Sequence, residues 1–208
     1  MIKFKNKKQL IIFDLDGVLI DSKKNMKIAW ESANKKFNLN LPFKKYFTQI
    51  GKPFNDILNS FKIKNKKKIQ KQFFKVSSNN INKIKLYKNI ENTLNKINSK
   101  KNIYIAIVTS KNKKRTNKIL KFFNIKVDFV QCPSKNLNGK PSPDQIIEVI
   151  KRFKIKKSKC VYIGDTNFDN IAAKKSKIDF ILAKYGYQIG IRKHKHSINN
   201  ISEILNIL

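Results

Sequence analysis

The fold of this chain is decided by the stretch IIFDLDGVLIDS, residues 11–22. Its apolar start is typical of a buried strand, and the Asp-Gly pair at residues 16–17 indicates a turn at the strand's end. Asp14 and Asp16 are separated by one residue, and two acids that close repel each other unless a cation or a shared proton relieves them. Mg²⁺ binds carboxylate, carbonyl and water oxygens, often together with a phosphate. The stretch therefore predicts a magnesium site; the alternative is a strand that ends in an acidic turn.

The length of the chain, 208 residues, allows one good core and a modest inserted domain. No apolar run approaches the roughly 20 residues that a membrane-spanning helix needs. The apolar stretch after the basic N-terminus is interrupted by Asp14, so it is too short for the core of a signal peptide. We therefore expect a cytoplasmic protein without a membrane partner.

The net charge of +34, from 47 basic and 13 acidic residues, would ordinarily suggest nucleic-acid binding. The excess is almost entirely lysine, however, and arginine occurs only at positions 115, 152 and 192. Nucleic-acid surfaces usually use arginine for bidentate contacts. Asn and Ile are abundant as well, a skew typical of A/T-rich coding. We interpret the charge as coding bias that also attracts small anionic substrates, and keep a nucleic-acid-binding protein as the less favoured alternative.

Apolar periodicity predicts a doubly wound α/β fold with a parallel, Rossmann-like sheet. The expected strands are 10–13, 103–108, 129–131, 160–163 and 180–183. Between and after them we expect helices at 112–123, 143–153, 166–175 and 201–208. A run of helical segments interrupts this alternation at 22–37, 43–47, 54–61, 66–76 and 89–98. The predicted domains are therefore an α/β core, residues 1–21 and 99–208, and an inserted helical cap, residues 22–98.

Polar residues stand where the predicted strands end, and parallel sheets bind ligands at that edge. Thr109 follows the second strand and is a candidate for a phosphate hydrogen bond, whereas the next residue, Ser110, is expected to cap a helix. Lys140 lies between Gly139 and two prolines, which stiffen the backbone and suggest a fixed ammonium. Asp165 and Asp169 follow the fourth strand. We predict that both are metal ligands. The alternative is that Asp165 is the N-cap of the next helix and Asp169 an acid in its first turn.

The order and spacing of these residues resemble the haloacid dehalogenase-like superfamily of phosphohydrolases, within its phosphoglycolate phosphatase and β-phosphoglucomutase branch. The resemblance covers nearly the whole chain, including the helical insertion. It is carried by four blocks: DLDGVLIDS at 14–22, VTS at 108–110, GKPSP at 139–143 and GDTNFD at 164–169. The first and last blocks are specific, whereas the middle two mean little in isolation.

The resemblance implies a role for each matching residue. Asp14 matches the nucleophile that forms an aspartyl-phosphate, and Asp16 matches the general acid and base, whose backbone carbonyl also binds the metal. An aspartate at the latter position favours phosphoryl transfer over dehalogenation. The residues implied to bind the phosphate are Thr109, Ser110 and Lys140. The acids expected to gather their side chains around Mg²⁺ are Asp14, Asp16, Asp165 and Asp169.

The predicted function is a Mg²⁺-dependent phosphatase that hydrolyses a small phosphomonoester metabolite, either phosphoglycolate-like or a sugar phosphate. The alternative within the family is a β-phosphoglucomutase-like phosphomutase. Gly51 and Lys52 resemble a cap loop that contacts the substrate, although an ordinary Gly/Pro turn explains the same residues. The small phosphorylated metabolite is the expected partner, and the chain is expected to be a monomer or a homodimer.

Overall fold

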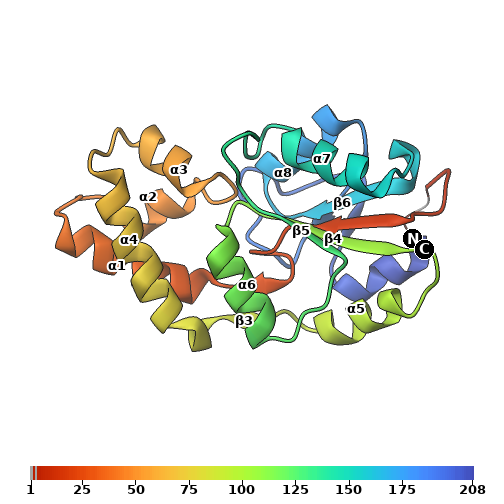
Figure 1. The fold of residues 1–208 in the computed structure, drawn as a ribbon, viewed down its shortest axis with the longest axis horizontal. Helices are drawn as coiled ribbons and strands as arrows, with labels where there is room; N and C mark the ends of the chain where they lie inside the picture. The colour runs from red at the N-terminus through yellow and green to blue at the C-terminus, as the bar shows by residue number, and fades with distance from the viewer. Residues whose placement is uncertain (1, 3) are drawn as a thin grey trace.

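The computed structural model describes residue 2 and residues 4–208 (Figure 1). Six parallel strands form one sheet in the order β5-β4-β1-β6-β7-β8, which confirms the doubly wound α/β fold. The central strand, β1, is completely buried, in keeping with its continuous apolar sequence. The strands are β1 (Leu10–Phe13), β4 (Tyr104–Val108), β5 (Phe129–Gln131), β6 (Cys160–Gly164), β7 (Asp179–Ala183) and β8 (Ser197–Ile198).

Alternate residues of the strands face opposite sides of the sheet and build two separate cores. Ile11 and Phe13 join the core under α5 (Ile90–Asn98), α6 (Lys113–Phe122) and the 3₁₀ helix η3 (Ile201–Ile207). Leu10 and Ile12 join the core under two other helices, α7 (Asp144–Phe153) and α8 (Asn167–Ser176). Figure 1 shows α7 and α8 on one side of the sheet and α5 on the other. The closing helix expected at 201–208 is therefore a 3₁₀ helix, and the short strand β8 was not expected.

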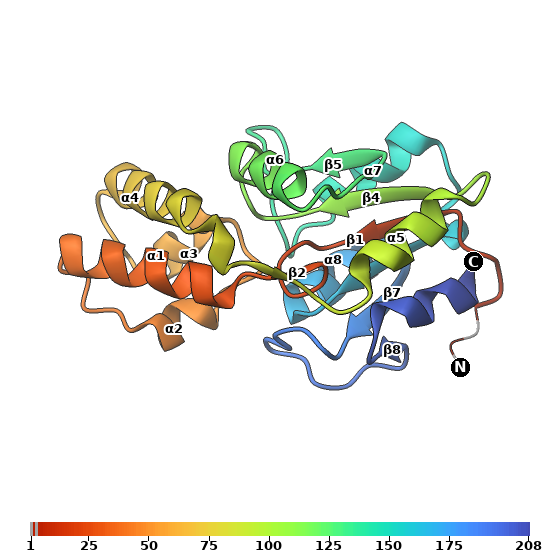
Figure 2. The same cartoon turned by 90° about the horizontal axis from the view of Figure 1, so that it is seen from below.

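Four helices between β1 and α5 pack around an aromatic core of their own. Trp30 stacks on Tyr46 with ring centroids 4.2 Å apart, and Phe73 packs against them. In Figure 2 these helices lie beside the sheet, beyond a narrow neck. They are α1 (Lys23–Lys36), α2 (Phe43–Phe47), α3 (Phe54–Ser60) and α4 (Lys66–Asn79).

The neck is a two-stranded antiparallel ribbon, in which β2 (Ile20–Asp21) pairs with β3 (Lys85–Leu86). Helix α5 follows the ribbon and packs on β4 and η3, with Ile90, Leu94 and Ile97 in the core of the sheet. We therefore propose that the cap comprises residues 22–84 and that α5 belongs to the α/β core, in place of the expected boundary at residue 98. These two units are called the cap and the core below.

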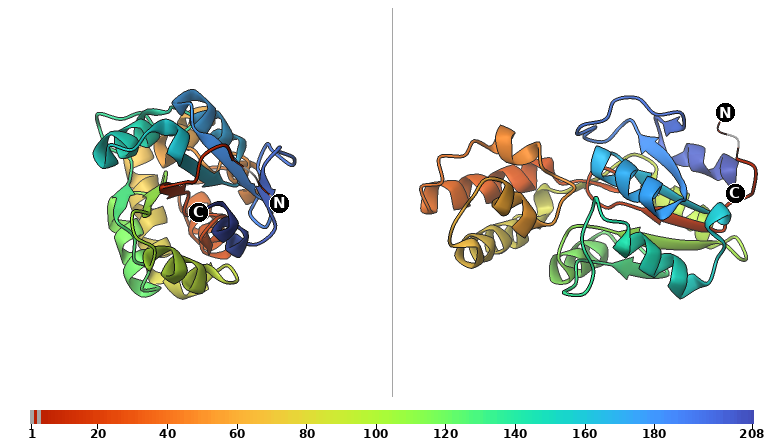
Figure 3. Two further views of the ribbon diagram at one scale, coloured as in Figure 1. Left: turned by 90° about the vertical axis from the view of Figure 1, so that its right-hand side faces the viewer. Right: turned by 90° about the horizontal axis from the view of Figure 1, so that it is seen from above.

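The strands run toward the cap, so the carboxyl ends of β1, β4 and β6 face it (Figure 2). Figure 3 shows the cap at one end of the long axis and η3, with the C-terminus, at the other. Within the described part of the chain, no helix is both long and apolar enough to span a membrane.

Candidate active site

Asp14 stands directly after β1, at the edge of the sheet that faces the cap. Its backbone N–H donates to the carbonyl of Ile163 at 2.9 Å, which continues the hydrogen-bond ladder between β1 and β6 by one residue. The side chain is buried, and its Oδ1 lies 3.0 Å from the ammonium of Lys140. The turn after it is allowed by Gly17, whose φ of +86° is in the region that favours glycine.

Lys140 is held in place by three side chains. Besides Asp14, its ammonium contacts Asp169 Oδ1 at 2.7 Å and the Tyr162 hydroxyl at 3.2 Å, and only 1% of the residue is exposed. Burial disfavours a charged ammonium, but the two carboxylates outweigh it and hold the pKa of Lys140 above its ordinary value. The fixed ammonium that the flanking prolines suggest is present.

Asp165 and Asp169 lie at the end of β6 and in the first turn of α8. Helix α8 is capped by Thr166, whose hydroxyl and N–H both contact Asp169 Oδ2 while Asp169 donates its own N–H back to Thr166 Oγ1. Asp165 is thus not the N-cap. Asp169 closes this capping box with one oxygen and binds Lys140 with the other. It is both a first-turn acid and a partner of the lysine.

Three carboxylates converge at this edge of the sheet. Asp14, Asp165 and Asp169 each offer an oxygen within 4.8 Å of the others. Asp165 Oδ2 accepts from the N–H of Tyr187 at 2.7 Å, whereas Oδ1 is buried and has no hydrogen-bond partner among the described residues. A buried carboxylate oxygen without a partner is costly, and a hard cation would satisfy it. These residues therefore fit a divalent metal ion, although the carboxylate of Asp16 is not among them.

The electrostatics of this cluster favour a bound cation. Burial raises the pKa of Asp14 to about 7; Asp169 and Asp16 add to the rise, and Lys140 opposes it. Burial, followed by the charges of Asp169 and Asp14, holds the pKa of Asp165 well above its ordinary range. Lys140 neutralises part of this negative charge; without a further cation, the acids relieve the remaining repulsion by taking up protons.

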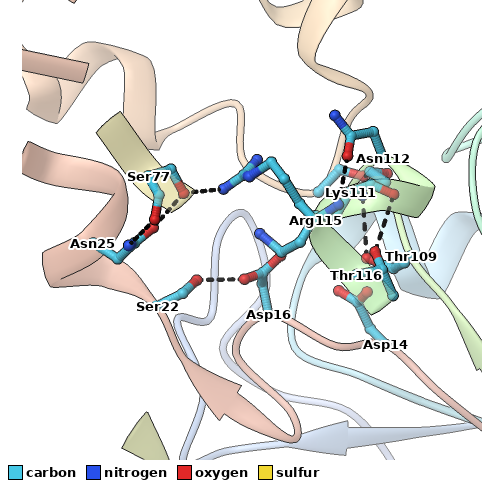
Figure 4. A network of polar contacts seen from close by, with 12 residues as sticks. Asp14, Asp16, Ser22, Asn25, Ser77, Thr109, Lys111, Asn112, Arg115 and Thr116 are labelled. Carbon is cyan, nitrogen blue, oxygen red and sulfur yellow. Dashed lines mark hydrogen bonds and ion pairs between the residues drawn. The ribbon is translucent and has the colours of Figure 1, made fainter. Parts of the chain in front are cut away.

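Asp16 lies in a different environment two residues further along. Burial opposes its ionisation, but Lys111 and the hydroxyl of Ser22 outweigh burial and hold the pKa of Asp16 below its usual value. Lys111 Nζ lies 2.9 Å from Asp16 Oδ2, and Ser22 Oγ donates to Asp16 Oδ1 (Figure 4). Two carboxyls with opposite pKa shifts are the usual sign of separate roles in one reaction.

The two hydroxyl residues after β4 differ in what they contact. Thr109 is buried beside Asp14 in the wall of the pocket, and its Oγ1 accepts from the N–H of Lys111 at 3.2 Å. Ser110 does not cap α6, because Asn112 takes that position and accepts from the N–H of Arg115 at 2.9 Å. Ser110 instead donates its hydroxyl to the carbonyl of Gly51 at 2.6 Å. The expected cap role of Ser110 is wrong, and the residue links core to cap.

A cavity of about 50 Å³ lies between the cap and these groups. Its core wall carries Asp14, Asp16, Thr109, Ser110, Lys111, Arg115 and Lys140, and its cap wall carries Met26, Tyr46, Ile50, Gly51, Lys52, Phe54, Ile57 and Phe73. Gly51 and Lys52 thus border the cavity, as the resemblance implies. The ammonium of Lys52 is held by Gln49 Oε1 at 2.8 Å and lies 4.9 Å from the centre of the Phe168 ring.

Three residues of the site were not expected from the sequence: Lys111, Arg115 and Tyr162. Lys111 could have been recognised by its position two residues after Thr109, but the many lysines of this chain hide that signal. Arg115 is one of only three arginines in the chain, and that rarity was a usable signal. Figure 4 shows the Arg115 side chain reaching from the core to Ser77 in the cap. Tyr162 looks like an ordinary strand residue, and nothing in the sequence marks it.

Comparison with known proteins agrees with this geometry. The family model for haloacid dehalogenase-like hydrolases matches residues 11–183. A phosphoglycolate phosphatase from Aquifex aeolicus is 29% identical over 183 residues, which is 86% of each chain.

Solved structures share the fold. A Lactobacillus plantarum protein, provisionally described as a phosphoglycolate phosphatase, superposes with a TM-score of 0.87 at 18% identity, over 98% of this chain and 100% of the other. A hydrolase from Pseudomonas syringae gives 0.84 at 20% identity, over 97% of both chains. The family model covers most of the chain, including the aspartates that follow β1 and those that follow β6. This chain belongs to the haloacid dehalogenase-like hydrolase family.

Proposed function

We propose that this hydrolase is a Mg²⁺-dependent phosphatase that cleaves a small phosphomonoester through an aspartyl-phosphate on Asp14. The observation that carries the proposal is the position of the Asp14 carboxylate. It borders the cavity, lies 3.0 Å from Lys140, and is one of three converging acids. The phosphatase name of the Aquifex aeolicus relative supports the same reaction. The substrate class, phosphoglycolate-like or sugar phosphate, belongs to the proposal.

The first half of the reaction transfers the phosphoryl group to Asp14. Asp16, which is ionised in the free protein, first takes the proton of a singly protonated phosphomonoester. An oxygen of Asp14 then forms a bond to phosphorus while the bond from phosphorus to the leaving oxygen breaks, and Asp16 gives its proton to that oxygen. In the second half, Asp16 takes a proton from water as the water oxygen attacks phosphorus. Asp16 passes this proton to the departing inorganic phosphate, so both carboxyls return to their first state. Ser22 and Lys111 hold the Asp16 carboxyl at the cavity for both steps.

The residues that would hold Mg²⁺ are Asp14, Asp165, Asp169 and the backbone carbonyl of Asp16. The bound ion supplies charge neutralisation between the nucleophile and the phosphate. We assign Lys140 and Thr109 to the transferring oxygens, since a fixed ammonium and a buried hydroxyl both border the cavity beside Asp14. The Ser110 hydroxyl donates to the Gly51 carbonyl, so we assign Ser110 to orienting the cap loop, with Lys52 beside it facing the leaving group.

The decisive experiment is phosphate release from a panel of phosphorylated metabolites, with and without Mg²⁺. Asp14→Asn and Asp16→Asn are expected to lower turnover by about 10³-fold or more, because each removes a group that makes or breaks a bond. Circular dichroism and thermal unfolding should show that both variants fold. Near-normal phosphate release by the Asp14→Asn protein would overturn the proposal, and transfer of the phosphate to a second sugar position would replace hydrolysis by a mutase reaction.

A further inference from the structure

Arg115 brings a second positive charge to the cavity, and the reaction above does not use it. The residue lies in the first turn of α6, is only 8% exposed and borders the same cavity as Asp14 and Asp16. Its Nη2 donates to Ser77 Oγ at 2.6 Å. Among the described residues, no carboxylate lies within the 4.0 Å of an ion pair with Arg115. The guanidinium is therefore a buried cation without an anionic partner.

A buried cation is stable only if its surroundings compensate it. The central carbon of the guanidinium lies 5.2 Å from the ring centre of Phe73 and 5.0 Å from that of Phe74, and such contacts compensate part of the charge. An arginine also carries five N–H donors in a fixed fork, which matches two oxygens of a carboxylate or phosphate. The hydrogen bond to Ser77 uses one of these donors. An anionic group in the cavity would use others.

The position of Arg115 relative to Asp16 says which part of a substrate it would meet. Asp16 protonates the leaving oxygen in the proposed reaction, so the leaving group lies next to Asp16. The Arg115 side chain runs past Asp16 toward Ser77 (Figure 4). The guanidinium therefore faces the leaving group and not the transferring phosphate, which Lys140 contacts from the side of Asp14.

The cap wall of the cavity is mostly apolar, with Lys52 as its one charged side chain. Met26, Ile57 and Phe73 are among the apolar residues of this wall, and the whole cavity measures about 50 Å³. A neutral sugar with many hydroxyls would leave several of them without partners there. A short leaving group with one compact anionic group would leave none.

We propose that Arg115 is the specificity-determining residue of this site and selects phosphomonoesters whose short leaving group carries a second anion, a carboxylate or a second phosphate. This inference rests on the proposed phosphatase activity. It names the substrate class that the site prefers.

The test compares three esters of similar size: 2-phosphoglycolate, its neutral amide, and the bisphosphate of ethylene glycol. The wild-type kcat/KM for the better of the two anionic esters should exceed that for the amide by roughly tenfold or more, as expected for one charge-assisted pair. The anionic ester with the higher kcat/KM identifies the preferred second anion as carboxylate or phosphate. Measurement at moderate salt removes the general attraction of anions by the +34 charge.

Arg115→Met keeps the unbranched stem of the side chain and removes its charge. The ratio of kcat/KM for the anionic esters to kcat/KM for the amide should therefore fall to near one. Arg115→Lys, which keeps the charge without the fork, should give an intermediate ratio and serves if the methionine variant does not fold. Arg152→Met is the matched control. Arg152 belongs to α7, its guanidinium lies over the ring of Phe129, and it does not border the cavity. Ser77→Ala removes the partner of the guanidinium but keeps the charge. Both controls should retain the preference.

A wild-type protein that hydrolyses the amide as well as the anionic esters would overturn the inference, and so would an Arg115→Met protein that keeps the preference. Failure of the proposed function looks different. In that case, no ester would be hydrolysed, and the generic substrate p-nitrophenyl phosphate would not be hydrolysed with Mg²⁺ either.

Discussion

Gly17 and Asp165 are in such close contact that a Cβ added at residue 17 would lie 2.0 Å from Asp165 Oδ2. A Cβ at Gly186 would likewise lie 2.5 Å from the Cβ of Asp165. Asp165 therefore occupies a slot that exists because two loops carry glycine. Within this slot Oδ1 has no hydrogen-bond partner among the described residues, and the carboxylate lies beside Asp14 and Asp169, which fits a metal ligand.

We predict that Gly17→Ala moves the Asp165 carboxylate and weakens Mg²⁺ binding by about tenfold or more. The substitution also costs about 1–2 kcal/mol because residue 17 has a φ of +86°. Gly190→Ala separates the two effects. Its φ is +71°, but its nearest contact is 3.2 Å, to Asn167. Calorimetric titration of Mg²⁺ should show weaker binding only in Gly17→Ala. Equal affinity in the two variants would mean that the slot does not hold a metal ligand.

The stabilisation of the protein by Mg²⁺ should depend on pH in a defined direction. Burial raises the pKa of Asp14 from 3.8 to about 7, so the folded protein holds this proton more tightly than the unfolded chain. The resulting stability is present at low pH and lost as pH rises through 7. Mg²⁺ replaces the proton, so saturating Mg²⁺ should raise Tm by about 5–10 °C at pH 8 and by less at pH 6. In Asp165→Asn the difference between the two pH values should shrink, and an equal rise in Tm at both pH values in the wild type would refute the assignment.

The sheet and the four blocks of the site could be read from the sequence because both depend on local pattern. Apolar runs of four to six residues mark most of the strands, and the polar residues after β1, β4 and β6 lie at the sheet edge. The boundary of the cap was harder to place. Helix α5 has the same amphipathic pattern as the cap helices, and only the pairing of β2 with β3 reveals that the chain has already returned to the core.

The ionic partners of the site could not be read in the same way. Lys111 is one lysine among many, and its burial against Asp16 depends on how α6 approaches the turn after β1. The aspartates were marked by their spacing, yet spacing did not say that Asp16 turns to Lys111 while Asp14 turns to Lys140. Which cation meets which acid is decided by tertiary packing, and the sequence carries no local trace of it.

Lys111 is expected to keep Asp16 ionised in the resting protein. Lys111→Met removes the nearest positive charge, so the pKa of Asp16 should rise toward the value that burial alone favours. The carboxyl carbon resonance of Asp16, identified by its loss in Asp16→Asn, reports this pKa in a pH titration. Turnover should fall by about tenfold or more, since the general acid and base loses its orientation.

Lys114→Met is the matched control for this variant, because it removes an exposed charge three residues away in α6. The pKa of Asp16 in Lys114→Met should equal that in the wild type. A Lys111→Met protein that titrates like the control would show that the 2.9 Å contact with Asp16 has no electrostatic effect.

Lys140 should contribute to both stability and catalysis, because its ammonium forms ion pairs with two buried acids. In Lys140→Met the Asp14 and Asp169 carboxylates lose their cation, and we predict a loss of about 3–5 kcal/mol in the free energy of unfolding at pH 8 without metal. The loss should be smaller at pH 6, since Asp14 can then take up a proton. Turnover should fall by about 10²–10³-fold, as it does when one donor to a transition-state oxygen is removed.

Tyr162→Phe isolates the support that this lysine receives. It removes a hydroxyl that lies 2.9 Å from Asp169 and 3.2 Å from Lys140, and it leaves every charge in place. Urea unfolding should show a loss of about 1–3 kcal/mol, with a fall in turnover much smaller than that of Lys140→Met.

If Lys140→Met unfolded at the wild-type urea concentration at pH 8, the two acids would not depend on the lysine for their charge, and the phosphate-binding role that we assign to its ammonium would lose its electrostatic basis.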